Sequence, residues 1–136
     1  MDHRLTVVLD TNVFVGGGFN PGSGSADMIA AVRDGRLRMA WSDATRAETR
    51  RILDRIPPLA WAPVEGLFRM EDRVEVEVDE ARWAGVPDPE DRKFAALAMA
   101  ADAVLVSSDR HLLDHVPELE VRPPGRWWRD VDPASG

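Results

Sequence analysis

Two short stretches of this chain are apolar at every position, and they constrain its fold more than any other feature. They are Val7-Val8-Leu9 and Val104-Leu105-Val106. Continuous apolar runs of this length are typical of parallel strands that are buried on both faces. Because parallel strands need crossover connections, usually helices, we predict an α/β fold with helices on both faces of a central sheet.

Strand-like and helix-like patterns alternate along the chain, as this fold requires. The strand-like runs lie at about residues 5–10, 37–42, 74–78, 103–108 and 119–122. The helix-like stretches lie at about residues 24–34, 43–56, 60–71, 89–101 and 109–115.

Two segments carry more specific expectations. Val74-Glu75-Val76-Glu77-Val78 alternates strictly, which predicts an edge strand with one solvated face. Gly16-Gly17-Gly18 and residues 21–25 predict a loop before the first full helix. No Gly-Lys-Ser/Thr motif follows these glycines, so the loop is not a phosphate cradle of the Walker type.

Length and composition indicate one globular domain over residues 1–136. No stretch is long and apolar enough to cross a membrane, and the N-terminus leads directly into a strand, so we expect a cytoplasmic protein. The chain has no cysteine, which excludes disulfides and thiolate metal sites.

The net charge of −7 argues against binding of nucleic acid by bulk electrostatics. It does not exclude a local basic strip, because Arg46, Arg50, Arg51 and Arg55 crowd one predicted helix. A solvated helix face explains the same pattern.

Four acidic residues stand where the apolar pattern calls for something else. Asp10 and Asp109 follow the apolar strand runs, and Glu48 and Asp91 fall on the apolar stripes of predicted helices. A buried carboxylate is costly unless it is paired or bound to a metal. If the four acids converge, a divalent cation is the natural way to satisfy them.

Topology makes their convergence plausible. The carboxyl ends of parallel strands meet at one edge of the sheet, and the following helices begin there. Glu48 is spaced four residues from Ile52 and eight from Ile56, so it shares the stripe that faces the sheet. Asp91 precedes Phe94 by three residues, again on the buried stripe.

Each acid also has a purely structural interpretation. Asp10 could cap a turn, and Glu48 could pair with Arg51 or Arg55 on its own helix. Residues 88–91, Asp-Pro-Glu-Asp, form a good helix start. Asp109 could cap the helix predicted to follow it. Four independent explanations would have to hold together, so we favour a shared functional site.

Four segments resemble the motifs of PIN-domain ribonucleases, in order and over nearly the whole chain. They are residues 7–15, residues 44–53 with Glu48, residues 88–98 with Asp91, and residues 101–113 with Asp109. Ser107 stands where the family usually has threonine, and a hydroxyl is retained. Asp88 matches an extra acid that occurs in one branch of the family.

The resemblance implies a three-layer α/β/α sandwich with a central parallel sheet of four or five strands. It implies Mg²⁺- or Mn²⁺-dependent cleavage of single-stranded RNA. Many small bacterial members are toxins of type II toxin–antitoxin pairs, each inhibited by an antitoxin protein, and homodimers are common among them.

We expect one acid set to serve both catalysis and metal binding in phosphodiester hydrolysis. Mg²⁺ and Mn²⁺ both suit oxygen ligands. Asn12, Ser107 and Asp88 are expected to orient the carboxylates, and Arg46 and Arg50 to hold flanking phosphates. The expected metal-binding and catalytic residues are Asp10, Glu48, Asp91 and Asp109.

Two other functions compete with this interpretation. An aspartate-dependent phosphatase also begins with an acid after its first strand, but it needs a second aspartate where this chain has Asn12. A non-catalytic PIN-like module that binds RNA or protein would fold in the same way, although loss of catalysis usually leaves the acid set incomplete.

Overall fold

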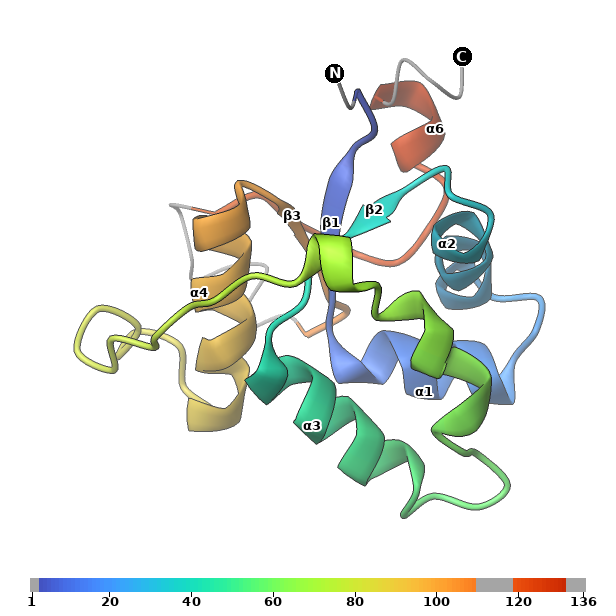
Figure 1. Cartoon of the computed structure of the whole chain (residues 1–136), viewed down its shortest axis with the longest axis horizontal. Helices are drawn as coiled ribbons and strands as arrows, with labels where there is room; N and C mark the ends of the chain where they lie inside the picture. The colour runs from blue at the N-terminus through green and yellow to red at the C-terminus, as the bar shows by residue number, and fades with distance from the viewer. Residues whose placement is uncertain (1–2, 110–118, 132–136) are drawn as a thin grey trace.

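The computed structural model describes residues 3–109 and 119–131. It contains a parallel sheet in the order β2-β1-β3-β4 (Figure 1). The strands are β1 (Thr6–Leu9), β2 (Arg38–Met39), β3 (Val104–Val106) and β4 (Val121–Arg122). The two continuous apolar runs thus form the two inner strands, as the sequence predicts.

Helices follow most of the strands. The α-helices are α1 (Thr11–Phe19), α2 (Gly24–Arg33), α3 (Asp43–Leu53), α4 (Arg92–Ala101) and α6 (Trp128–Val131). The short 3-10 helices are η1 (Ala62–Leu67), η2 (Met70–Asp72) and η3 (Pro89–Asp91).

The sheet separates two apolar cores, because successive side chains of a strand point to opposite faces. Val7 and Leu9 of β1 pack in the core that contains α1 and α2 residues, whereas Val8 packs in the core formed largely by α4. Figure 1 shows α4 on one side of the strands and α1 and α2 on the other. The prediction of an α/β sandwich around a parallel sheet is therefore confirmed.

The predicted edge strand at 74–78 is wrong. In the described part of the chain this segment forms no strand, and only an isolated bridge joins Trp41 to Arg73. Val74, Val76 and Val78 do pack against the α4 core, while Glu75 and Glu77 are exposed. The alternation therefore reports which side chains are buried, without the hydrogen-bonded ladder that defines a strand.

The predicted loop at Gly16-Gly17-Gly18 is also wrong, because these residues form the last half of α1. A Cβ built on Gly17 would lie 2.6 Å from Ile29 Cδ1, and one on Gly18 would lie 2.5 Å from Leu59 Cδ2. A Cβ on Gly17 would also lie 3.2 Å from the backbone nitrogen of Ala26, so glycine there permits the close approach of α2 to α1, whereas at Gly18 only the flexible end of Leu59 would have to move.

The other helix predictions differ mainly in their limits. The stretch predicted at 60–71 is divided into η1 and η2, with Phe68 and Arg69 between them. The stretch predicted at 89–101 begins as η3 and continues as α4. Most of the helix predicted at 109–115 lies outside the described residues. Within the described ranges, no helix is long and apolar enough to span a membrane.

Candidate active site

Asp10 lies directly after β1 and is 4% exposed. Its Oδ1 accepts a hydrogen bond from the backbone N–H of Asn12 (3.1 Å), so it caps α1. Its Oδ2 accepts one from Ser107 Oγ (2.7 Å). The sheet register explains this second contact, because Leu9 is paired with Val106 and the next residues of both strands leave the sheet together.

The burial of Asp10 has an electrostatic cost. Desolvation raises the pKa of Asp10 above its ordinary value, and the hydrogen bond from Ser107 opposes that rise. The negative charge of Asp109 raises the Asp10 pKa further. Asp10 is therefore a carboxylate that hydrogen bonds hold in place while a like charge stands nearby.

Asp91 is the most strongly perturbed acid of the site. It ends η3 at the start of α4 and is half-buried. Desolvation raises the pKa of Asp91 to about 7, and the negative charges of Asp10, Asp88 and Asp109 add to the effect. Asp91 also shares a hydrogen bond with Asp109. We call Asp10, Asp91 and Asp109 the aspartate cluster.

Asp109 is placed by the loop that leaves β3. Its backbone N–H donates to Ser107 Oγ (3.0 Å), while the same hydroxyl donates to Asp10 Oδ2. Ser107 is fully buried and so links the two acids through one fixed oxygen. The expected orienting role of Ser107 thus has a direct counterpart in these contacts.

Asn12 and Asp88 were expected to orient the acids through their side chains, but their hydrogen bonds are of a different kind. The side chain of Asn12 is exposed, and its contact with Asp10 comes from the backbone N–H. Asp88 is exposed and caps η3 by accepting from the backbone N–H of Glu90 (2.9 Å). Asp88 nevertheless adds negative charge next to Asp91.

Glu48 is held by different partners. Its Oε1 accepts from Lys93 Nζ (2.9 Å) and its Oε2 from Thr11 Oγ1 (3.0 Å). The Thr11 hydroxyl also contacts Thr49 Oγ1 (3.1 Å). Burial raises the pKa of Glu48, and the hydrogen bond with Lys93 counteracts this rise. The cation of Glu48 comes from α4, and not from an arginine of its own helix.

Lys93 also contacts a second acid. Its Nζ donates to Glu90 Oε2 (2.7 Å) and so bridges Glu48 and Glu90. We call Glu48, Lys93 and Glu90 the lysine-centred group. Sequence reasoning missed Lys93 and Glu90 as site residues. The available signal was that Lys93 is the only lysine of the chain and stands two residues after Asp91.

The two arginines expected to bind phosphates lie one turn apart on α3 and differ in their contacts. Arg46 pairs with Glu65 (3.4 Å), and its guanidinium stands over the ring of Trp61 at 5.0 Å from the centroid. Arg50 is exposed. The role expected for these arginines stays a prediction.

The residues of the aspartate cluster suit a divalent cation chemically. Their donor atoms are all oxygens, and the repulsion that raises the pKa of Asp91 is the kind that Mg²⁺ or Mn²⁺ relieves. Across residues 3–109 and 119–131, however, no three acidic or histidine side chains are placed to hold one metal ion together. Metal binding would therefore require these side chains to rearrange toward a shared centre.

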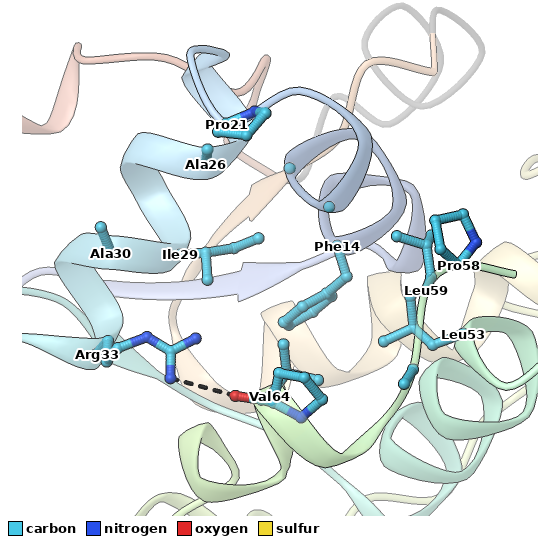
Figure 2. Close-up of a pocket in the computed structure, with 14 residues that line it drawn as sticks. Phe14, Pro21, Ala26, Ile29, Ala30, Arg33, Leu53, Pro58, Leu59 and Val64 are labelled. Atoms are coloured by element: carbon cyan, nitrogen blue, oxygen red, sulfur yellow. Dashed lines mark hydrogen bonds between the residues drawn. The ribbon is translucent and has the colours of Figure 1, made fainter. Parts of the chain in front are cut away.

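An apolar pocket of about 430 Å³ lies elsewhere, between α1, α2 and the segment after α3 (Figure 2). Phe14, Ile29 and Leu59 line it, and Arg33 donates a hydrogen bond to the carbonyl of Pro63 (3.2 Å) at this pocket. None of the described acids is among its lining residues. The pocket is therefore separate from the aspartate cluster.

Comparison with known proteins agrees with this geometry. The family model described as PIN domain matches residues 6–111, which is more than half of the chain and includes all four acids. A search of curated proteins finds none that matches the chain. PIN domains are generally nucleases and typically use divalent metals.

Proposed function

This chain belongs to the PIN-domain family, and from that premise we propose that it is a Mg²⁺- or Mn²⁺-dependent endoribonuclease that hydrolyses phosphodiester bonds of single-stranded RNA. The observation that carries the proposal is the aspartate cluster at the carboxyl edge of the sheet. Burial, together with the like charges of Asp10, Asp88 and Asp109, raises the pKa of Asp91 to about 7, as expected where a protein gathers acids for an external cation.

In this proposal the aspartate cluster holds the metal. When bound, the cation supplies positive charge that stabilises the scissile phosphate and the leaving oxygen and promotes ionisation of water. Ser107 holds one oxygen of Asp10 and the backbone of Asp109, so it brings the two chain segments that carry these acids together. Asp91 comes from the start of α4 and completes the set from another side.

Glu48 lies beside the cluster with both oxygens already engaged. Direct metal binding by Glu48 would require one of these hydrogen bonds to be given up. Its proposed contribution is therefore to place negative charge and a proton acceptor next to the metal site. The Thr11 hydroxyl and Lys93 hold it in that position.

The test is cleavage of a labelled single-stranded RNA with Mn²⁺ by the wild-type protein and by Asp10→Asn. We expect a fall of at least about 100-fold, because outer-sphere changes at metal sites alone cost 10- to 100-fold. Asp34→Asn, an exposed acid at the end of α2, is the control and should retain full activity. A single-stranded DNA of the same sequence should be cleaved much less.

Two results would contradict the proposal. Full activity in Asp10→Asn would remove the aspartate cluster from the reaction. Absence of Mn²⁺ binding by calorimetry, together with absence of cleavage in the wild type, would favour a non-catalytic RNA- or protein-binding module. Cleavage of phosphomonoesters instead of RNA would favour the phosphatase alternative.

We also propose that the chain is the toxin of a type II pair and that it is inhibited by an antitoxin protein. The support for this role is the resemblance of its motifs to those of small bacterial PIN toxins. Expression of the wild-type chain should arrest growth, whereas expression of Asp10→Asn should not. Co-expression with the product of the adjacent reading frame should restore growth and yield a complex, and sedimentation should show whether the free chain is a homodimer.

A further inference from the structure

The lysine-centred group combines a covered cation with one covered and one exposed acid. The side chains of Glu48 and Lys93 are 11% and 18% exposed, whereas that of Glu90 is 62% exposed. Glu48 is further held by Thr11, but Glu90 reaches Lys93 from the solvent side. Exposed ion pairs contribute little stability, so Glu90 is the acid that another anion can most easily replace.

A second cation acts electrostatically on the same exposed acid. Arg51 stands three residues after Glu48 on α3, so the two side chains occupy neighbouring positions on one helix face. The positive charge of Arg51 acts on the Glu90 carboxylate from α3, while Lys93 acts on it from α4. Among the described residues, Arg51 has no ion pair of its own. Glu90 therefore occupies an anion position between two helices.

The anion position and the aspartate cluster are built on the same two chain segments. Lys93 stands two residues after Asp91 at the start of α4, and Thr11, which donates to Glu48, directly follows Asp10. Figure 1 shows the beginning of α3 beside this end of α4. An RNA strand whose scissile phosphate lies at the aspartate cluster would bring a neighbouring phosphate near Lys93. Phosphate oxygens accept hydrogen bonds from ammonium and guanidinium groups as carboxylate oxygens do.

We propose that Lys93 and Arg51 form a binding position for an RNA phosphate next to the scissile one, and that Glu90 occupies this position in the free protein. Substrate would displace the Glu90 carboxylate and leave Lys93 paired with Glu48. The inference rests on the proposed ribonuclease function, because it takes the substrate to be an RNA strand. It assigns substrate binding to residues that lie within two of the motif segments but are not among the four acids.

A purely structural role for Lys93 is the competing explanation. In that case Lys93 only neutralises Glu48, and Glu90 is an incidental surface partner. The two explanations differ in what removal of the Glu90 charge does. A phosphate position should bind RNA more tightly once its internal competitor is gone, whereas an incidental partner should affect RNA binding no more than any other exposed acid.

The chain offers a closely matched control for Glu90. Glu80 is 63% exposed and pairs at 3.0 Å with Arg92, whose side chain is 17% exposed. Arg92 also belongs to the start of α4, but its other partner is the carbonyl of Val86, whereas that of Lys93 is Glu48. Glu80→Gln and Glu90→Gln therefore remove the same charge from similar pairs, and they differ in whether the cation also binds Glu48.

The experiment measures binding of a short fluorescent single-stranded RNA by anisotropy, in the Asp10→Asn background with EDTA, so that cleavage and metal do not contribute. We expect Glu90→Gln to tighten binding roughly twofold to fivefold, and Glu80→Gln to change it much less. Arg51→Gln should weaken RNA binding by a similar factor and should reduce the slope of log K against log salt concentration by about 0.7. Arg36→Gln, in the loop between α2 and β2, should do neither.

Equal binding by Glu90→Gln and Glu80→Gln, or no RNA binding by any variant, would overturn the inference. Circular dichroism of each variant checks that the fold is retained, and the gain in affinity expected for Glu90→Gln cannot result from unfolding. The proposed nuclease activity fails separately. If the wild type does not cleave RNA with Mn²⁺ but the Glu90→Gln effect persists, the phosphate position stands and the reaction does not.

Discussion

The aspartate cluster and the lysine-centred group lie side by side at the start of α4, yet they accommodate buried acids in opposite ways. In the aspartate cluster, burial and the repulsion of neighbouring carboxylates together raise the pKa of Asp91 to about 7. In the lysine-centred group, Lys93 compensates the charge of Glu48 from within the chain. The first arrangement is suited to an external cation, and the second already contains its cation.

From the sequence, all four acids were expected to share one task, metal binding and catalysis. The structure divides them between a group without an internal cation and a group that contains one. A phosphodiesterase must bring a metal and a phosphate strand together without letting the acids repel the strand. Here the repulsion is concentrated in the aspartate cluster, where the metal is proposed to bind. In the phosphate position proposed above, Lys93 and Arg51 would provide positive charge for the strand. Substitution of single side chains, either in the aspartate cluster or in the lysine-centred group, therefore tests whether the two groups have these different roles.

The largest effect on stability is expected for Lys93→Met. This change leaves Glu48 largely covered without its cation, and we expect the free energy of unfolding to fall by roughly 1–3 kcal/mol. Urea denaturation measures it. The double variant Lys93→Met/Glu48→Gln should recover much of the loss, because no isolated charge remains. A double variant that is as unstable as the sum of both single variants would show that the pair is not coupled.

A change of opposite sign is expected for Asp91→Asn in metal-free protein. The pKa of Asp91 is about 7 in the folded protein, whereas the ordinary value of 3.8 applies in the unfolded chain. The folded state therefore binds more protons between these values, so stability falls as pH rises through this window and the full penalty remains above it. Asp91→Asn should show a smaller fall and exceed the wild type in stability at about pH 8.

Urea denaturation at about pH 5 and pH 8, with EDTA present, measures this effect. The raised pKa values of Asp10 and Glu48 act in the same direction, so part of the pH dependence should remain in Asp91→Asn. Asp34→Asn serves as the control. A variant at position 91 that is less stable than the wild type at high pH would show that the aspartate cluster carries no unrelieved repulsion.

The smallest effects are expected from deletion of one hydroxyl group next to the aspartate cluster or next to the lysine-centred group. Ser107→Ala removes the donor to Asp10, and Thr11→Val removes the donor to Glu48. Each should cost about 1 kcal/mol of stability. Only Ser107→Ala should weaken Mn²⁺ binding, by about tenfold, because it alone orients an acid of the aspartate cluster. Equal losses of Mn²⁺ affinity in calorimetry would contradict the assignment of metal binding to the aspartate cluster alone.

The sheet and the positions of three acids could be predicted because they depend on local patterns. Val7-Val8-Leu9 has no polar face, so a buried parallel strand was the natural interpretation, and an acid directly after such a strand must lie at the carboxyl edge. The same reasoning applies to Asp109 after β3. The start of α4 followed from the proline at 89 and the apolar stripe that includes Phe94.

The failures concern features that depend on distant partners. Gly17 and Gly18 of α1 lie against Ile29 and Leu59, which are 12 and 41 residues away in sequence, and Gly17 also lies close to the backbone of Ala26 on α2. The segment 74–78 has the burial pattern of a strand but lacks the ladder, because backbone pairing with Trp41 ends at Val74.

The partner of Glu48 illustrates the same limit at the site. Spacing on α3 favoured Arg51 or Arg55, but the helix turns Glu48 toward α4, where Lys93 lies 45 residues further along the chain. Only the packing of α3 against α4 reveals this pair. The charge balance of the site, unlike the identity of its acids, is thus a property of the tertiary structure.

The most direct test of the division is calorimetric titration of Mn²⁺ into the wild type, Asp91→Asn and Glu48→Gln at about pH 7.5. The account predicts that Asp91→Asn loses at least tenfold in affinity, while Glu48→Gln stays within about threefold of the wild type. A loss in Glu48→Gln as large as that in Asp91→Asn would contradict it, because the cation would then be held by all the acids alike.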